Sequence, residues 1–550
     1  MAWTQRFIDE LARPHRRPRF VVESLRGFGL PFEATAIRWS SHAEAGYDQV
    51  ITREGTSLTH GSLSVGQWTV SPGGLSVGLT RQVDRSRLLP GLVVHLRMGF
   101  DGWAVEDFEP IFVGVLTQLG RQGRRWMASF GGLEGQLNVR WGIGAPYPSD
   151  PEVFLDAGTT KTLDIDFVPG ATTLDIASST EPRKASDGDY LVRVMQNNGE
   201  TILVKASGLS SPSAGVTRLT GCTFGEMDSP GHTDTANAGN DVVYLVWDEQ
   251  HPLRIAQRLV TSSDSGNGAE DVYPREWGLG VPESVTDPDD WAAQRVLSGP
   301  DGMTSPGWHL LQDAPATTFG QWLTSYLADG AFWLCQRQGL LTGRGLQALE
   351  SQSISLYPTD RHLLDVQYTS FGGQLEYRYV DVHDHGGRTA ALPHPYDPDA
   401  QLVDQVARLL GTMAPTLPPV TGPDHRTTSS RSLGARTPWG RPSQLERQHV
   451  LPVFGSTPDR SAWRLGVLLR VLPYMTRRTE PITVTLAGLH WSQLGIGDAL
   501  GLITGTVDSR RGPNDLVTKG GWHTVVGGGM NPFNGTTTFQ LVAVSPDDES

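Results

Sequence analysis

A Gly-x-Ser-x-Gly pentapeptide marks the nucleophile of many serine hydrolases, and Gly74-Leu75-Ser76-Val77-Gly78 matches that pattern. The chemistry requires the serine on a sharp turn between a strand and a helix. Here apolar and polar residues alternate on both sides of Ser76, as they do in a strand, and no helical pattern follows. We therefore predict that Ser76 is a strand residue and not a nucleophile.

A second set of residues has metal-binding types at close spacing: Asp381, His383, Asp384 and His385. The two histidines would share one face only if the segment is an extended strand. The second ligand cluster that a catalytic zinc needs is not evident in the sequence. We interpret the segment as a solvated turn.

The acidic and Gly-rich stretch from Asp264 to Asp271 is similar to a calcium loop in composition, but it lacks the ligand spacing and the terminal Glu of an EF-hand. An exposed loop explains it as well, so calcium stays an alternative. No pair of carboxylates stands in the setting that glycoside hydrolysis requires, and no phosphate loop or dinucleotide fingerprint occurs. We predict no catalytic residue, no cofactor and no metal site.

The charge balance of the chain disfavours some classes of binding partner. Lys and Arg number 45 against 59 Asp and Glu, which gives a net charge of −14 and disfavours sequence-independent binding to DNA or to an anionic membrane. The one basic run, Arg13 to Arg19, is interpreted as a solvated or interface arm. Cys222 and Cys335 are too few for a disulfide framework or a four-thiolate metal site, although one bridge between them stays open. The N-terminus lacks the apolar stretch of a signal peptide, and no run approaches the ~18 apolar residues of a membrane span.

The elements that would position any site are mostly short strands. The 64 Gly and 37 Pro exclude a helical repeat, and residues 36–140 alternate with a period of two, as in an antiparallel barrel or sandwich. Within that region, the similar hexapeptides at 61–66 and 73–78 are predicted to be neighbouring strands of a meander. Residues 160–247 keep the strand pattern and are predicted to form a separate small β module.

Helical periods appear in the middle of the chain. Leu253, Ala256 and Val260 share one helical face, and Phe319, Trp322, Leu323 and Tyr326 share another, with Gly330 ending the second helix. A hairpin follows, with its turn at Gln338-Gly339. Further helices are predicted at 399–410 and from Thr457 to a stop at Pro473, separated by a long exposed loop at 411–447. Strands return after residue 481.

These patterns predict a mainly β, multidomain fold with an α+β middle: two barrel-like β domains, an inserted small β module and helix-containing domains. The predicted divisions are an N-terminal arm (1–35), a first β-barrel-like domain (36–150), the inserted module (151–248), an α+β domain (249–350), strands with a two-helix α+β region and a long loop (351–480), and the closing strands of a second β-barrel-like domain (481–550).

The order of several motifs resembles the tail hub, baseplate hub or tail-tip proteins of long-tailed bacteriophages and of gene transfer agents. The motifs are His251 to Ser262 with Asn267-Gly268 and Asp271 to Ser284; Thr217 to Gly225 with Asn240 to Tyr244; Phe319 to Leu346; and Asp399 to Gly411, Thr457 to Pro473 and Gly495 to Thr504 with its Gly497-Asp498 turn. The sequence departs from hubs that carry an iron-sulfur cluster, because it has two cysteines, and from hubs that are fused to a lysozyme or endopeptidase.

The resemblance implies a structural virion protein, not an enzyme, located in the distal tail or baseplate and assembled in the cytoplasm of a bacterial host. It implies a homotrimer whose two barrel-like domains per chain form a pseudo-sixfold ring. This ring would join a hexameric tail tube or distal tail protein to threefold tip or fibre proteins, contact the tape-measure protein and form part of the DNA exit channel. DNA would pass without specific binding, and no membrane insertion is expected.

Two other functions stay open from the sequence. One is a tail-associated cell-wall or capsule hydrolase, which would need two convergent carboxylates or a metal. The other is a carbohydrate-binding host-recognition protein, suggested by the 16 Trp, which would need several of them exposed on one face.

Overall fold

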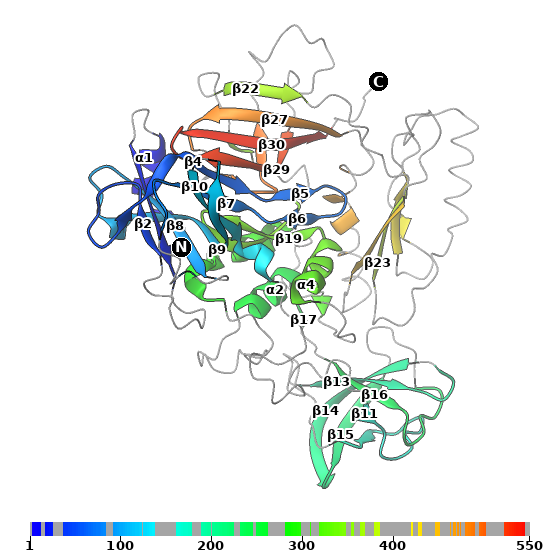
Figure 1. Cartoon of the computed structure of the whole chain (residues 1–550). Coiled ribbons are helices and arrows are strands. Elements are labelled where there is room, and N and C mark those ends of the chain that lie inside the picture. Colours follow the sequence, from blue (N-terminus) through cyan, green and yellow to red (C-terminus); the bar gives the residue numbers. More distant parts are fainter. Residues whose placement is uncertain are drawn as a thin grey trace, which may run out of the picture.

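The computed structural model of the 550-residue chain is mainly β, as expected from the sequence (Figure 1). The residues it describes are 3–12, 17–25, 37–83, 88, 92–123, 125–137, 161–178, 189–199, 201–224, 232–245, 249–261, 281–298, 308–309, 318–347, 354–356, 363–368, 379–384, 420–421, 427–431, 446–451, 463, 466–468, 470–471, 474, 479–489, 494–501 and 522–544.

One large sheet combines strands from both ends of the chain. Two further strands, β21 (Ile354–Leu356) and β28 (Ala499–Gly501), join it beside β29. Among the described strands, β22 and β3 are each paired on one side only, so the large sheet is open at both ends of its strand order. Its main order is β22 (Leu363–Tyr368), β27 (Thr479–Ala487), β30 (Thr536–Val544), β29 (Trp522–Asn531), β4 (Ile51–His60), β7 (Gly74–Leu79), β10 (Arg125–Gly132), β9 (Glu109–Gln122), β8 (Val93–Phe100), β1 (Pro18–Ser24), β2 (Arg38–Ser40) and β3 (Asp48–Gln49).

The two terminal β regions meet at a seam between β29 and β4. Gly528 lies opposite His60, and Gly529 lies opposite Thr59. Glycine permits this approach at Gly529, where a Cβ would lie 2.7 Å from the carbonyl oxygen of Leu58 in β4. On the other side of β29, a Cβ on Gly528, whose φ is +144°, would lie 2.1 Å from that of Thr538 in β30. The seam is therefore made by backbone contact.

The N-terminal segment contributes to this sheet more than an arm would. Helix α1 (Gln5–Ala12) begins this segment, and Phe7 is fully buried against Phe100 and Trp3. The predicted arm also contains β1, which pairs along its full length with β8 and buries Phe20. The sequence did not predict this strand, because only Phe20, Val21 and Val22 are apolar and the residues on both sides of them include charged ones.

The two similar hexapeptides are not neighbours, so that prediction is wrong. Residues 73–78 fall mainly in β7, which pairs with β4, whereas residues 61–66 contain β5 (Ser62–Ser64), which pairs with β6 (Thr69–Ser71) in a separate two-stranded sheet. The cause is Gly61 and Gly73, where a close backbone approach bends one long hairpin into two pairs.

The inserted module forms a six-stranded barrel of its own. Its ends are joined: Leu163 bridges Ile176, and the N–H of Asp164 donates to the carbonyl of Asp175 at 2.9 Å. A separate apolar core fills it, including Leu174, Val192 and Leu219. The strand order is β11 (Lys161–Thr162), β16 (Asp241–Leu245), β13 (Tyr190–Met195), β14 (Thr201–Ser213), β15 (Val216–Phe224) and β12 (Thr173–Ile176).

The middle of the chain packs onto the large sheet through one continuous apolar core. The predicted helical faces are buried in α2 (Pro252–Thr261) and α4 (Phe319–Ala328), and Thr318 and Gln321 form a capping box on α4. The left-handed residue after α4 is Ala331 (φ +58°) rather than Gly330, and the Ala331 methyl is fully buried. The hairpin of β19 (Phe332–Arg337) and β20 (Leu340–Gly345) has its turn where predicted.

One helix was not predicted. Helix α3 (Pro288–Ser298) packs on β20 and α2. Its signal was present, because Asp287 followed by Pro288 suits the N-cap and first helical position, and the N–H of Asp290 donates to the Asp287 carboxylate at 3.2 Å. A single short turn of apolar residues, around Trp291, gave too weak a periodicity.

Three predictions in residues 379–474 are wrong, and one lies outside the described residues. Asp381 and His383 belong to β23 (Tyr379–Asp384), not to a solvated turn, and the expected loop at 411–447 contains strands. Strand β25 (Thr427–Arg431) was not predicted, because its sequence is polar although it pairs with β23. Tyr474, one residue beyond the predicted stop at Pro473, is helical, and its buried hydroxyl is 2.5 Å from that of Thr524. The helix at 399–410 lies outside the described residues. The sheet comprises β24 (Val420–Thr421), β25 (Thr427–Arg431), β23 and β26 (Glu446–Leu451).

The remaining described elements are small. Strands β17 (Glu249–Gln250) and β18 (Trp308–His309) form a two-stranded sheet, and short 3-10 turns lie at Val105–Asp107, Leu133–Gln136 and Glu283–Val285. In the described part of the chain, none of the helices has the length and apolar character needed to span a membrane. The domain boundaries given above stay predictions.

Candidate functional site

The β19–β20 hairpin lies between the two β regions, and its turn is built for close approach. Gln338 and Gly339 both have positive φ, +51° and +73°, as a two-residue hairpin turn requires. A Cβ on Gly339 would lie 2.7 Å from backbone atoms of Ile111 and Phe112 in β9. The turn therefore rests directly on the backbone of the first β region.

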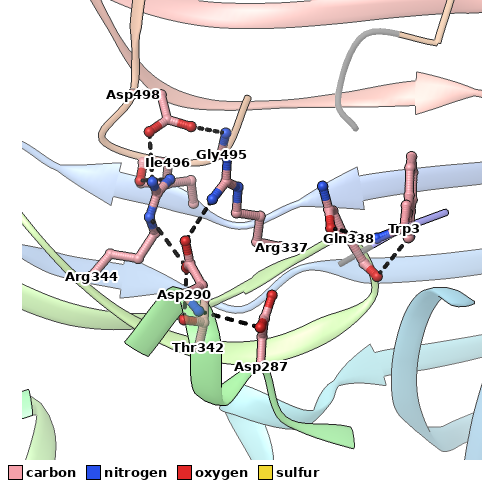
Figure 2. Close-up of polar contacts among 10 residues, drawn as sticks. All are labelled: Trp3, Asp287, Asp290, Arg337, Gln338, Thr342, Arg344, Gly495, Ile496 and Asp498. Carbon is pink, nitrogen blue, oxygen red and sulfur yellow. Dashed lines mark hydrogen bonds and ion pairs between the residues drawn. The ribbon is translucent and has the colours of Figure 1, made fainter. Parts of the chain in front are cut away.

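Trp3, near the N-terminus, is hydrogen-bonded to this turn (Figure 2). The Trp3 indole N–H donates to the carbonyls of Pro110, at 2.8 Å, and of Gln338, at 3.2 Å. The Trp3 backbone N–H donates to Gln338 Oε1, also at 3.2 Å. Trp3 thus joins β9 to a hairpin 335 residues later in the chain.

A buried glutamine makes the next contact. Gln336 Oε1 accepts from the N–H of Val113 at 3.0 Å, and its Nε2 donates to the Val113 carbonyl at 2.7 Å, which copies a strand pairing. The same Nε2 lies 2.6 Å from Glu134 Oε2, and Glu134 Oε1 accepts from the N–H of Gly73 at 2.8 Å. Burial raises the pKa of Glu134, and these hydrogen bonds oppose that rise.

Four buried or half-buried charges link the hairpin to helix α3 and to the second β region (Figure 2). Asp290 of α3 accepts from Arg337 at 2.5 Å and from the Thr342 hydroxyl at 2.8 Å. Arg344 Nη2 donates to Asp498 Oδ1 at 2.6 Å, and its Nε lies 3.8 Å from Asp290 Oδ2. We call Asp290, Arg337, Arg344 and Asp498 the junction network.

The Gly-Asp turn positions Asp498. Gly497 has a φ of +94°, and the N–H of Gly495 donates to Asp498 Oδ2 at 2.7 Å. Arg344 Nη1 also donates to the carbonyl of Ile496 at 3.3 Å, and a Cβ on Gly495 would lie 2.7 Å from this nitrogen. Gly495 is therefore required for the guanidinium to reach this turn, while Gly497 supplies its positive φ and leaves room for the ring of Trp333.

Helix α3 positions Asp290 in the same way. The Asp287 N–H donates to the carbonyl of Leu341 in β20, and Thr286 bridges Leu341, so the chain just before the helix pairs with the hairpin. The ring of Trp291 fills the space over Gly343, where a Cβ would lie 2.2 Å from it. Asp290, in the first turn of α3, thereby lies at the edge of the hairpin.

The electrostatics favour the charged forms. Burial alone would raise the pKa of Asp498, but the guanidinium charges of Arg344 and Arg337 outweigh it and hold that pKa below its usual range. For Arg344, burial opposes the charge, while Asp498 and Asp290 raise the pKa above its ordinary value. Every carboxylate of the junction network is thus engaged by Arg, which suits a structural joint rather than acid–base chemistry.

The thiols offer no nucleophile. Cys335, opposite Thr342 in the hairpin, and Cys222, in the inserted barrel, are both free and buried, which answers the open question of a bridge between them. Burial raises the pKa of Cys222 to about 12 and that of Cys335 further. Both are neutral thiols that pack as small apolar side chains.

The sequence candidates do not gather here. Ser76 lies within β7, between Ser57 and Ser129 of its neighbouring strands, as predicted. His383 lies in β23; His385 and the stretch from Asp264 to Asp271 lie outside the described residues. Within the described ranges, no group of three His, Cys, Asp or Glu could hold a metal ion. Seven Trp are buried, and none of the described exposed large apolar side chains is Trp: the buried ones are Trp3, Trp39, Trp68, Trp291, Trp322, Trp333 and Trp463.

The junction itself was only partly visible in the sequence. The Gly497-Asp498 turn and the hairpin were both noted, but Asp290 was missed with α3. A sharper signal was Arg337 and Arg344, two charges placed in strands whose other residues, apart from Gln336, are apolar or small.

Comparison with known proteins finds tail proteins among solved structures. No family model matches the chain, and no curated protein matches it. The 43 kDa tail protein of prophage MuSo2 from Shewanella oneidensis is 9% identical over 96% of this chain and 99% of its own, with a TM-score of 0.33. A tail protein from Neisseria meningitidis MC58 is 9% identical, covers 96% of each chain and has a TM-score of 0.35. Prophage tail protein gp18 from Listeria monocytogenes EGD-e is 7% identical over 96% of this chain and 95% of its own, with a TM-score of 0.34.

Proposed function

We propose that this chain is a structural protein of a phage or gene transfer agent tail, and specifically its hub. The observation that carries the proposal is the junction: residues of the hairpin and of the Gly-Asp turn, which bear the sequence resemblance to hubs, make the contacts that hold the two β regions together. Trp3, Gln336 and Gly339 act on the first region, and Arg344 acts on the second through Asp498. A ring protein that transmits load along a tail needs its two β regions at a fixed angle, and a buried joint supplies that.

In the assembled tail we propose a homotrimer between the tail tube or distal tail protein and the tip or fibre proteins. Each chain would contribute two β regions to a pseudo-sixfold ring, contact the tape-measure protein, and line part of the DNA exit channel. The net charge of −14 supports this channel, because an acidic lumen does not retain a polyanion by neutralising its phosphates. A lumen lined mainly by Arg would contradict it.

Two measurements test the proposal. Light scattering on the purified protein should give three times the mass of one chain, and antibodies against it should label the distal end of tails in electron micrographs. Labelling of capsids, or of no particle, would overturn the tail assignment. Labelling of the distal tail by a stable monomer would leave a tail protein but overturn the trimeric hub.

The hydrolase alternative is tested separately. Zymography with host envelopes should show no clearing by this protein beside a lysozyme control. Clearing that persists in a Ser76→Ala variant and is lost on chelation would instead indicate a metal-dependent hydrolase.

A further inference from the structure

The inserted barrel has an exposed apolar surface at one end. Among the described residues, six large apolar side chains are exposed, and three of them are in the barrel: Ile165, Val168 and Met195, with 51%, 48% and 40% of their surface exposed. Single exposed apolar residues are ordinary, but three at one end of a small barrel form a patch.

The segments that carry these residues are hydrogen-bonded to one another. The N–H of Leu163 donates to the carbonyl of Asn240, and Asn240 Nδ2 donates to the carbonyl of Met195 at 3.0 Å. Phe167 and Ala236 exchange backbone hydrogen bonds, and Asn197 Oδ1 accepts from the N–H of Asn237. We call residues 163–168, 195–199 and 232–241 the barrel tip.

The barrel tip is one end of the barrel. Strand β13 ends there, at Met195, and strand β16 begins there, at Asp241. The last residue of β16, Leu245, pairs with Leu191 near the start of β13. The apolar patch is therefore at the end of the barrel opposite Tyr190 and Leu245.

The charge of the tip has one sign. Asp164, Asp166, Asp234 and Asp241 lie in its three segments, which contain no Lys or Arg. Three of these aspartates are exposed, and Asp234 is half-buried. Acidic side chains around apolar ones complement a cationic, amphipathic partner, and they disfavour pairing of two identical tips.

Two further contacts hold the three segments of the barrel tip together. Gln196 is 2% exposed, and its Oε1 accepts from the N–H of Asp234 at 2.9 Å. His232 Nε2 lies 3.2 Å from the Phe167 carbonyl, to which it must donate, and the two rings are stacked. The exposed apolar and acidic side chains of the tip are therefore carried on a fixed backbone.

We propose that the barrel tip binds a cationic, amphipathic segment of another protein, with Arg or Lys side chains against the aspartates and apolar side chains against Ile165, Val168 and Met195. This inference does not depend on the hub assignment. The barrel is a closed unit with its own core, so such a contact would recruit a partner without disturbing the junction.

The test uses the full-length protein and a fluorescein-labelled peptide of alternating Arg and Leu, followed by fluorescence anisotropy. We expect saturable binding that weakens with salt. Ile165→Ser and Asp164→Lys should each weaken it by about tenfold, as loss of one central contact does. Leu364→Ser, which removes a side chain 57% exposed on β22, and Asp48→Lys, at an exposed carboxylate of β3, are the matched controls and should change it less than twofold.

Three outcomes would overturn the proposal. The first is no binding by the unmodified protein. The second is an equal loss in the control variants, which would mean that the peptide binds the acidic surface at large. The third is equal binding of an alternating Glu and Leu peptide, which would mean that charge plays no part.

Discussion

The inserted barrel and the large sheet differ in how their edges are closed and in which contacts stabilise them. In the barrel, the two edge strands of the sheet order, β11 and β12, are joined through the bridge of Leu163 to Ile176, so the sheet is closed there, and the barrel is filled by its own core. The large sheet draws strands from both ends of the chain, leaves β22 and β3 paired on one side, and depends on a hairpin from the middle of the chain. The barrel is therefore self-contained, whereas the sheet needs contacts across hundreds of residues.

The placement of charge follows this difference. In the barrel, the ion pair of Arg218 with Asp175 is at the surface on the Arg side, with 39% of that side chain exposed. In the junction network, Arg344 is 3% exposed and Asp498 is 8% exposed. Removing one partner of a buried pair leaves an uncompensated charge, so the sheet should be far more sensitive to such a change.

The largest expected effect is that of Arg344→Met, which leaves Asp498 buried without its cation and leaves Asp290 with Arg337 alone. We expect a loss of about 3–5 kcal/mol in the free energy of unfolding, measured by urea denaturation. Hydrogen exchange should show faster exchange in both β7 and β29, with the barrel strands unchanged. Arg81→Met, which removes an exposed ion pair with Asp48, is the control and should stay within ~0.5 kcal/mol. Exchange that changes in only one β region would show that the hairpin does not couple the two.

Beside the seam, Gly528→Ala should cost about 2–4 kcal/mol, because the added Cβ would lie 2.1 Å from the Thr538 carbonyl of β30 in a backbone conformation that L-residues avoid. Gly102→Ala is the matched control. Gly102 also has a positive φ, +83°, but nothing lies within 4 Å of its Cβ position, so the cost should be about 1 kcal/mol. Equal thermal shifts for the two variants would mean that the close approach of β29 to β30 is not required.

In the barrel, Val192→Ala removes two methyl groups from the separate core and should cost about 2 kcal/mol locally. Hydrogen exchange should then rise in β13, β14 and β16 while the large sheet keeps its protection. Loss of protection in β9 or β30 of this variant would show that the barrel and the sheet unfold together, contrary to the comparison.

Mild acid should weaken the large sheet through its buried histidines. Burial, aided by the charges of Arg470 and Arg295, lowers the pKa of His251 to about 3; burial and Arg97, opposed by Glu23, lower that of His95 to about 4. Because the unfolded chain has histidine pKa values near ~6.5, it binds more protons below that pH, and stability falls as the pH falls. Each histidine should contribute a slope of about 1.4 kcal/mol per pH unit between pH ~6.5 and its folded pKa.

Urea denaturation at pH 7.5, 6.0 and 5.0 measures this slope. Asp498 does not contribute in that range, because its lowered pKa places its own loss of stability below about pH 4. His95→Phe should reduce the slope by one histidine's share, and an unchanged slope would contradict the assignment.

How far the sequence predicts this fold depends on the distance between partners. Period two located most strands of the large sheet and of the barrel, and the Gln338-Gly339 signal located the hairpin turn, because each depends on residues within about ten positions. The pairing of β29 with β4, and of Arg344 with Asp498 154 residues away, leaves no local signal. Strand β25, with the sequence Thr-Thr-Ser-Ser-Arg, was missed since its pairing is supplied by β23 and not by apolar alternation.

The seam has a consequence for how the chain is made. Strand β4 is complete at residue 60, but its partner β29 begins at residue 522. At synthesis rates of about 5–20 residues per second, roughly 25–90 s pass before that edge can be covered. For this interval the growing chain presents unpaired backbone donors and acceptors along one edge of β4. Translation speed and early chaperone access therefore determine what fraction of the chains completes the large sheet rather than aggregating.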